Sequence, residues 1–364
     1  MKSKKIIFYI SSLAKAGAQR VILNLTESLL EKGHQVTIVT TAIVENEYDL
    51  PLGANRVISD ITGEEITSNR ILNFKNRFLK LRSVWKQEQP DVIVSFIGKN
   101  NFMAILTAWG LKLPVLVSVR GEPMEEYYNQ TLRMLAKYLF RVADGIILQT
   151  EDSKNFFPKK TMEKAIVLPN PLNPEFMKDL SGGEKEKKIV MVGRIDSNKN
   201  QKLVIDAFLP IAKKYNEYQL EIWGDGEDLE VLKKYVSELK MEHQILLKGA
   251  TKEVRKKIEK ASLYILSSNT EGMPNSLMEA MALGLPCIST DCPCGGPKTL
   301  IQNGINGILT PVKDVAAMTA AMDRVLGNPE FANSLGTQAM EIRKTLSPKS
   351  VNKQWENYLI SKSR

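Results

Sequence analysis

Histidine and cysteine are scarce in this sequence. The two histidines, His34 and His243, lie far apart along the chain, and the three cysteines, Cys287, Cys292 and Cys294, lie within one short stretch. An odd number of crowded cysteines provides no disulfide framework and suits a reducing compartment. A zinc site needs more ligands than these cysteines supply, so we expect no bound metal.

Long apolar runs are also absent, and none approaches the length that spans a bilayer. Residues 1–5 are basic, but the apolar run that follows, residues 6–10, is too short for a signal peptide and is interpreted as a strand. The chain has 364 residues, of which 43% are hydrophobic and 25% charged. Such a composition is typical of a soluble globular protein, and the length is sufficient for two domains. Together with the cysteines, we expect a cytoplasmic protein.

The net charge of +9 is unevenly distributed, because residues 70–86 contain six basic residues and no acidic one. Apolar residues recur there at alternating spacings of three and four, which predicts a helix with one apolar face: Ile71, Phe74, Phe78, Leu81 and Trp85. This face either packs on the protein's own sheet or contacts anionic lipid, and the flanking charges are suited to lipid or to a diphosphate-bearing acceptor. Nucleic acid is a poorer partner, because no stacking platform or reading helix accompanies the charge.

Strand and helix patterns alternate through both halves of the chain, which predicts two parallel α/β domains. A proline-rich segment, residues 167–174, places the boundary near Pro169, giving domains of residues 1–168 and 169–349, with a C-terminal helix, residues 350–364, that returns to the first. The predicted strands of the first domain are residues 6–11, 35–40, 91–97, 115–119 and 145–150, with a helix at 18–32. Those of the second are residues 188–192, 220–223, 245–248, 263–266, 286–290 and 307–309.

The loop after the first strand has a single glycine, Gly17, where a dinucleotide fingerprint needs three, so that class of site is excluded. Gly17 still permits close approach of the backbone to a ligand.

Two glutamates follow the strand at residues 263–266. Glu271 comes after its carboxyl end, and Glu279 lies inside a helix predicted at residues 275–283. Ligands bind at this edge of a parallel sheet, and a helix N-terminus favours an anion there. Carboxylates accept hydrogen bonds from sugar or ribose hydroxyls. Alternatively, Glu279 is a solvated helix residue and Glu271 a charge at the helix N-terminus.

Glu271, seven intervening residues and Glu279 resemble the Glu-x7-Glu motif of family 4 retaining glycosyltransferases, which have the GT-B fold. Gly193, Arg194 and Lys199 resemble that family's Gly-Arg, spacer, Lys motif, although alone both cations are compatible with an ordinary loop. The stretch from Leu13 to Arg20 is similar to the family's small-residue loop, with Ala16 and Gln19 in place of a glycine and an acid. The resemblance implies two doubly wound Rossmann-like domains that face each other across a cleft.

The resemblance also implies transfer of a sugar from a nucleotide sugar to an acceptor hydroxyl. Arg194 and Lys199 would neutralise the departing diphosphate, with Glu271 on the sugar hydroxyls and Glu279 on the ribose. Asp-x-Asp metal ligands are missing, so we expect no divalent metal and no other cofactor. The catalytic residues implied are Arg194, Lys199 and Glu271. The further donor-binding residues implied are Gly17, Gly224, Gly249, Gly272, Met273, Pro274, Asn275, Ser276, Leu277 and Glu279, and Gly295 with Gly296 can offer backbone N–H groups to the phosphates.

For the acceptor, the candidate positions are Ala16 and Gly17 in the small-residue loop, Lys75 and Arg82 on the basic helix, and Lys99 and Arg120, each of which follows a predicted strand. Arg120 stands where many family members have a histidine that contacts the donor sugar, so its ligand is a phosphate or the acceptor. Because UDP-sugars are the frequent donors in this family, the resemblance implies a UDP-sugar donor such as UDP-GalNAc, UDP-GlcNAc or UDP-Gal. The basic helix favours a saccharide acceptor on a lipid carrier, in cell-surface polysaccharide synthesis on the inner face of the cytoplasmic membrane.

Two other classes stay open. A nucleotide-sugar epimerase on the same fold would need a cleft acid and base, and the scarcity of histidine argues against it. A non-catalytic sugar-nucleotide or membrane-binding subunit would not need the whole motif set.

Overall fold

The computed structural model describes residues 2–180 and 182–364 and divides the chain into two compact units. Unit 1 contains Met1–Pro171 and Lys349–Arg364, and unit 2 contains Leu172–Pro348. The first junction lies close to Pro169, where the sequence predicts the boundary. The C-terminal segment belongs to unit 1.

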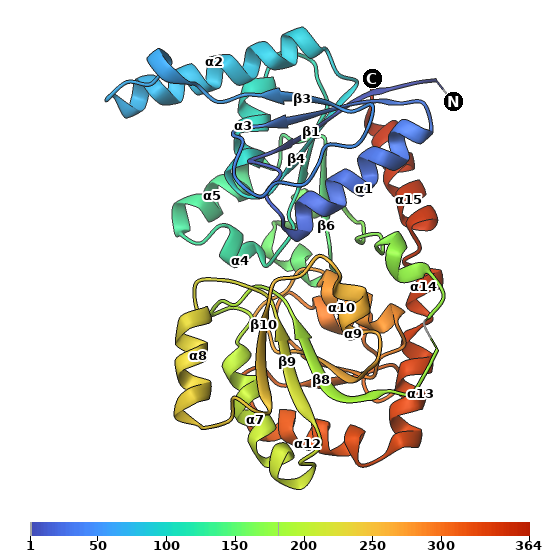
Figure 1. Cartoon of the computed structure of the whole chain (residues 1–364). Helices are drawn as coiled ribbons and strands as arrows, with labels where there is room; N and C mark the ends of the chain where they lie inside the picture. Colours follow the sequence, from blue (N-terminus) through green and yellow to red (C-terminus); the bar gives the residue numbers. More distant parts are fainter. Residues whose placement is uncertain (1, 181) are drawn as a thin grey trace. The chain divides into compact units, whose positions relative to one another are not determined.

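Unit 1 is built on a seven-stranded parallel sheet with the order β3-β2-β1-β4-β5-β6-β7 (Figure 1). Its strands are β1 (Lys5–Ile10), β2 (Gln35–Thr40), β3 (Asn55–Ile58), β4 (Val92–Phe96), β5 (Val115–Ser118), β6 (Gly145–Leu148) and β7 (Ala165–Val167). The sequence predicts all of these except β3 and β7. Both are short strands at the two edges of the sheet and neither is fully buried, so neither has the continuous apolar run of a central parallel strand.

Helices cover both faces of this sheet. The core on one face joins buried residues of α2, α3 and α5 to the strands, including Trp85, Ile105 and Ala136. On the other face, Trp355 of α15 stacks on Phe96 of β4, with ring centroids 6.1 Å apart, and its indole Nε1 donates to the Pro169 carbonyl. The helices of unit 1 are α1 (Gly17–Glu31), α2 (Arg70–Glu88), α3 (Lys99–Ala108), α4 (Pro123–Glu126), α5 (Gln130–Leu139), α6 (Lys159–Met162) and α15 (Pro348–Lys362), with 3-10 turns η1 (Gly63–Glu65) and η2 (Asp152–Phe156).

Unit 2 has a six-stranded parallel sheet with the order β10-β9-β8-β11-β12-β13. Its strands are β8 (Glu186–Val192), β9 (Gln219–Trp223), β10 (Ile245–Gly249), β11 (Ala261–Leu266), β12 (Cys287–Thr290) and β13 (Ile308–Thr310). Its helices are α7 (Gln201–Lys214), α8 (Leu229–Glu238), α9 (Val254–Ile258), α10 (Asn275–Ala282), α11 (Gly296–Leu300), α12 (Val315–Leu326), α13 (Pro329–Ala339) and α14 (Ile342–Thr345), with the 3-10 turn η3 (Pro174–Met177). All six strands are predicted from the sequence.

The strand order changes direction between β8 and β11, which pair directly. In an open parallel sheet the carboxyl ends on either side of such a switch point form a crevice that binds ligands. Arg194 and Lys199 follow β8, and Glu271 follows β11. The topology of unit 2 therefore brings the two sequence motifs to one place.

Candidate functional site

The loops that follow β8 and β11 are fastened to each other through Asn198. Its carbonyl accepts from the N–H of Asn269 at 2.7 Å, its Oδ1 accepts from the N–H of Thr270 at 3.0 Å, and its Nδ2 donates to the Thr270 carbonyl at 3.1 Å. Asn198 lies in the spacer of the Gly-Arg…Lys motif, and sequence reasoning did not single it out. The sequence feature that could have indicated Asn198 is an asparagine in a loop, because its side-chain amide can form hydrogen bonds that replace backbone–backbone bonds of a turn.

Lys199 and Glu271 lie at the centre of these two loops and form an ion pair between Nζ and Oε1. The same carboxylate oxygen accepts from the Ser268 hydroxyl at 2.6 Å. The two charged side chains are only 15% and 12% exposed, so solvent screens the pair less than a surface pair. The structure thus brings together two of the three predicted catalytic residues and adds Ser268, which the sequence did not indicate.

Arg194 differs from Lys199 in its exposure. Its side chain is 74% exposed, and Nη2 lies 3.2 Å from Oδ2 of Asp196. The other oxygen of Asp196 accepts from the backbone N–H of Lys199 at 2.8 Å. Asp196 therefore ties the two cations of the motif together and leaves the guanidinium of Arg194 accessible to an anion.

Glu279 is buried in α10, with 4% of its surface exposed, so it is not the solvated helix residue of the alternative interpretation. Burial raises the pKa of the nearby Tyr264 hydroxyl well above its usual range, and the carboxylates of Glu279 and Glu271 raise that pKa further. Since both carboxylates act on one hydroxyl, Glu271 and Glu279 share the same neighbourhood. A buried carboxylate beside a second one favours a ligand that donates hydrogen bonds.

Two glycines of this edge are required by close backbone packing. A Cβ on Gly224 would lie 1.8 Å from the Gly193 carbonyl oxygen, and one on Gly296 would lie 1.7 Å from that of Gly272. Gly224 and Gly296 are therefore needed for the packing of these loops, and their contact with the donor stays a prediction. Gly249 differs from them, because it has a φ of +72° and no atom lies within 4 Å of the position that a Cβ would occupy, so space is open beside it.

The remaining predicted donor residues of unit 2 form the turn into α10. Gly272 to Pro274 precede the helix, and Asn275 is its first residue. Met273 and Leu277 are buried, whereas the sequence offered both as donor contacts, so only their backbone is suited to that role. Ser276, the second residue of α10, is partly exposed.

Arg120 of unit 1 is engaged by its own domain. Its guanidinium carbon lies 5.5 Å from the ring centroid of Phe96 and 5.6 Å from that of Trp355, and Nη2 donates to Oδ1 of Asn170. Burial lowers the pKa of Arg120 to about 9, which the carboxylate of Glu126 partly counteracts. Arg120 therefore helps to hold α15 on the sheet, a structural role that the sequence did not predict.

The other predicted acceptor residues of unit 1 fall into two groups. Ala16 and Gly17 stand at the N-terminus of α1, and Lys99 is exposed at the start of α3, so all three follow carboxyl ends of strands. Lys75 is exposed on α2. Arg82 instead donates from Nη1 to the carbonyls of Thr107 and Trp109, both at 2.7 Å, which favours a role in fixing the end of α3.

The apolar face predicted for α2 is divided. Leu81 and Trp85 are buried against the sheet, as the packing interpretation expects, whereas Ile71 is 81% and Phe74 53% exposed. The N-terminal half of the helix therefore presents large apolar side chains to the outside among basic ones.

Among the side chains that the structure describes, no three of His, Cys, Asp or Glu are grouped as a metal would require. Over the same residues, no helix combines the length and the apolar character that crossing a bilayer demands.

Comparison with known sequence families assigns both units. The family described as Glycosyltransferase Family 4 matches residues 16–176, and the one described as Glycosyl transferases group 1 matches residues 173–342. The chain belongs to glycosyltransferase family 4. The resemblance seen in the sequence is confirmed, and the protein is a glycosyltransferase.

Similar proteins match almost the whole length of the chain. An uncharacterized glycosyltransferase of Haemophilus influenzae is 28% identical over 98% of this chain and 100% of its own length. The GalNAc-alpha-(1->4)-GalNAc-alpha-(1->3)-diNAcBac-PP-undecaprenol alpha-1,4-N-acetyl-D-galactosaminyltransferase of Campylobacter jejuni is 27% identical over 96% of this chain and 97% of its own length. HepE of Anabaena, solved with UDP-glucose, matches 98% of this chain and 100% of its own with a TM-score of 0.82 and 16% identity. The GT-B fold is therefore confirmed.

Proposed function

We propose that this glycosyltransferase transfers a hexose or N-acetylhexosamine, with retained anomeric configuration, from a UDP-sugar to a hydroxyl of a saccharide carried on a polyprenyl diphosphate. The observation that carries the proposal is the cluster at the β8–β11 switch point. It combines an accessible guanidinium, a lysine held by a carboxylate and a buried second carboxylate. This set matches a ligand with an anionic centre and hydroxyls on both sides.

In this mechanism the diphosphate lies against Arg194 and Lys199, the ribose hydroxyls donate to Glu279, and a sugar hydroxyl donates to Glu271. The bond between the sugar C1 and the diphosphate oxygen breaks, and the bond from C1 to the acceptor oxygen forms on the same face. The acceptor proton moves to the departing diphosphate. The two cations stabilise the charge that develops on this leaving group, which removes the need for a divalent metal.

Lys199 must exchange partners when the donor binds. In the structure its Nζ is paired with Glu271, so a diphosphate that attracts the ammonium group would free Glu271 to accept from the sugar. We propose that this exchange couples recognition of the phosphate to recognition of the sugar.

Two relatives support the choice of substrates. The name of the Campylobacter jejuni relative describes a transfer of N-acetylgalactosamine to an undecaprenyl-diphosphate-linked saccharide, and HepE was solved with UDP-glucose. The exposed apolar and basic half of α2 is suited to an anionic bilayer surface, and we place the protein peripherally on the inner face of the cytoplasmic membrane, in cell-surface polysaccharide synthesis.

The test begins with thermal unfolding in the presence of UDP-GalNAc, UDP-GlcNAc, UDP-Gal, UDP-Glc and GDP-Man. A specific donor at a hundred times its Kd stabilises the native state by about 2.7 kcal/mol. The stabilising donor is then incubated with polyprenyl-diphosphate-linked saccharides, and the linkage of the product is determined by NMR. Inverted product contradicts the retaining mechanism. An epimer formed without acceptor supports an epimerase, and tight binding without transfer to any acceptor supports a non-catalytic subunit.

A further inference from the structure

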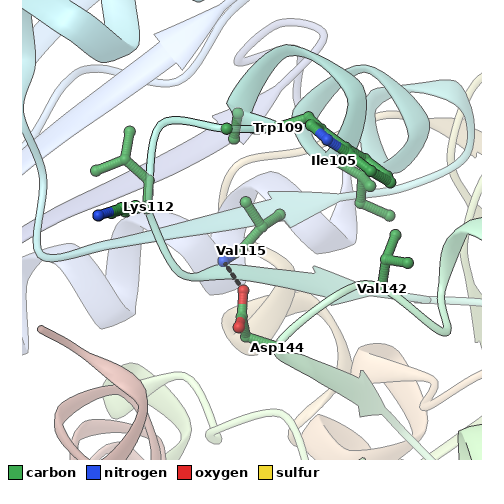
Figure 2. Close-up of a pocket in the computed structure, with 9 residues that line it drawn as sticks. Ile105, Trp109, Lys112, Val115, Val142 and Asp144 are labelled. Carbon is green, nitrogen blue, oxygen red and sulfur yellow. Dashed lines mark hydrogen bonds between the residues drawn. The ribbon is translucent and has the colours of Figure 1, made fainter.

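An open hollow of about 330 Å³ lies in unit 1 where α3 ends and where β5 and β6 begin (Figure 2). Its walls include the apolar side chains of Ile105, Val115 and Val142, with the indole of Trp109 beside them. Val115 is the first residue of β5, so the hollow lies at the amino-terminal edge of the sheet. Gly17, Lys99 and Arg120 all follow carboxyl ends of strands, so the hollow is separate from these three predicted acceptor residues, whereas a fourth, Arg82, lies beside it.

Trp109 is distinguished by its exposure. The chain has four tryptophans, of which Trp85, Trp223 and Trp355 are buried, whereas Trp109 is 63% exposed. Val142, another residue of the lining, is 50% exposed. A tryptophan at a water boundary has an apolar body that gains free energy on burial and an N–H that prefers a polar layer, which is why tryptophan is enriched at membrane interfaces.

Exposed apolar side chains continue from the hollow onto α5. Met134 is 53%, Leu135 41% and Tyr138 61% exposed, and with Val142 they recur at helical spacings of three and four. Since α3 and α5 pack on the same face of the sheet, this helix extends the apolar surface that begins at Trp109. Contiguous exposed apolar surface of this kind usually marks a binding face.

The charge around this surface is predominantly positive. The α2 helix carries six basic residues and one acidic one, residues 99–115 carry two basic and no acidic ones, and residues 130–142 carry three basic and no acidic ones. Arg82 donates to the Trp109 carbonyl at 2.7 Å, and Lys164 donates to the Arg141 carbonyl at 2.7 Å, so both cations lie close to the hollow. Lys112 is exposed in its lining.

Among the described residues that line the hollow, Asp144 alone is acidic. Its Oδ2 accepts from the backbone N–H of Val115 at 2.8 Å, so this carboxylate joins the starts of β5 and β6 (Figure 2). Lys164 donates to the carbonyl of the preceding residue, Ala143, at 3.2 Å, and Lys112 lines the same hollow, so basic side chains outnumber the acidic one at the rim.

We propose that the Trp109 hollow takes a hydrocarbon chain of an anionic phospholipid and so anchors unit 1 to the bilayer, with Trp109 inserted at the interface. The proposal rests on the membrane-linked acceptor of the proposed function, and it makes the occupant a bulk lipid rather than the acceptor. The apolar walls match the chain, and the basic rim matches the anionic headgroup. A second copy of the chain is disfavoured as occupant, because a two-fold contact would bring this basic surface against itself.

The test uses the intrinsic fluorescence of the full-length protein, because Trp109 is the tryptophan whose exposure allows lipid to reach it. Vesicles of phosphatidylglycerol and phosphatidylcholine should shift the emission to shorter wavelength, and dibrominated acyl chains should quench it. Trp109→Phe should abolish both signals, since the three remaining indoles are buried. Vesicles of phosphatidylcholine alone should quench at least tenfold less at the same lipid concentration.

A second measurement tests the hollow itself. In vesicle co-sedimentation, Val142→Asp should weaken binding about tenfold, whereas the matched control Val231→Asp, at an apolar residue of α8 that is 69% exposed, should bind as the wild type does. Both variants should unfold at the wild-type temperature, because both positions are exposed. Binding without quenching of Trp109, or equal quenching by uncharged vesicles, would overturn the proposal. So would a blue shift that rises with protein concentration in the absence of lipid, which would identify a second copy as occupant.

The outcome is independent of the proposed chemistry. Donor binding and sugar transfer to a water-soluble acceptor analogue should be unchanged in Val142→Asp, so an active enzyme without lipid quenching rejects the anchor alone. Lipid quenching by a protein that transfers no sugar rejects the proposed function and leaves the anchor in place.

Discussion

Lys199 and Glu271 form an ion pair that connects the loops following two neighbouring parallel strands, β8 and β11. Seventy-two positions separate them in the sequence. The pair lies at the point where the strand order of unit 2 changes direction. In the proposed mechanism, a donor diphosphate that enters there draws Lys199 away from Glu271 and leaves the carboxylate to accept from the sugar.

Arg194→Ala should lower kcat about a hundredfold, because one preorganised cation at a leaving group contributes roughly 3 kcal/mol to transition-state stabilisation. The fold should survive, since the Arg194 side chain is 74% exposed. Steady-state kinetics with the stabilising donor measures the effect. Lys202→Ala is the matched control, because Lys202 is an exposed cation of the same unit paired with Asp206. Turnover of Arg194→Ala near the wild-type rate would rule out the assigned role.

Lys199→Met and Glu271→Gln should be non-additive in a double-mutant cycle on the free energy of unfolding. Each single variant leaves a weakly exposed partner without its counter-charge, and the double variant removes both. We expect a coupling energy of about 0.5–3 kcal/mol, measured by denaturant unfolding without donor. Strict additivity would show that the pair contributes nothing to the native state.

Gly296→Ala should impair donor binding although it replaces no charged residue. The new methyl group would lie 1.7 Å from the Gly272 carbonyl, next to Glu271, so the loop must move. The donor-induced thermal shift should be lost, and unfolding should require about 1–3 kcal/mol less. Gly182→Ala serves as control, because no atom lies within 4 Å of its Cβ position. An unchanged thermal shift in Gly296→Ala would contradict this positioning role.

Arg120→Gln distinguishes a structural arginine from a ligand-binding one. If the guanidinium between Phe96 and Trp355 holds α15, the variant should lose about 1–3 kcal/mol of unfolding free energy even in the absence of substrate. Lys99→Gln, at an exposed position on the same edge of the sheet, should not change stability. A stable Arg120→Gln enzyme with a raised KM for acceptor would favour the acceptor-binding prediction instead.

Glu47 should make unit 1 sensitive to acid. Two hydrogen bonds from Arg56, at 2.6 and 3.0 Å, with further bonds from the N–H groups of Leu13 and Val44, lower the pKa of Glu47 from 4.5 to about 2. As the pH falls, Glu47 is protonated in the unfolded chain before it is protonated in the folded one. Its contribution to the free energy of unfolding is therefore complete above pH 4.5 and is lost as the pH falls toward 2.

Glu47→Gln tests this sign by denaturant unfolding at several pH values. The variant should be less stable than the wild type by about 2 kcal/mol at neutral pH, since hydrogen bonds to a charged group are lost. The difference should shrink between pH 4.5 and 2. A difference that stays constant down to pH 2 would show that the Glu47 carboxylate is not specifically stabilised.

The sequence by itself determined the fold class and the identity of the motif residues. Central parallel strands are buried on both faces and read as continuous apolar runs, and the Glu271, Glu279, Arg194 and Lys199 motifs keep their spacing in the chain. Edge strands β3 and β7 escaped prediction because they are only partly buried.

Only the tertiary structure decided which side chains meet. It paired Lys199 with Glu271, placed Arg120 between Phe96 and Trp355, and exposed Ile71 while burying Trp85 on the same helix. Local spacing sets the face of a helix on which a residue lies, but contacts across strands and between chain ends depend on strand order and register. Those relationships are long-range, and no short stretch of sequence contains them.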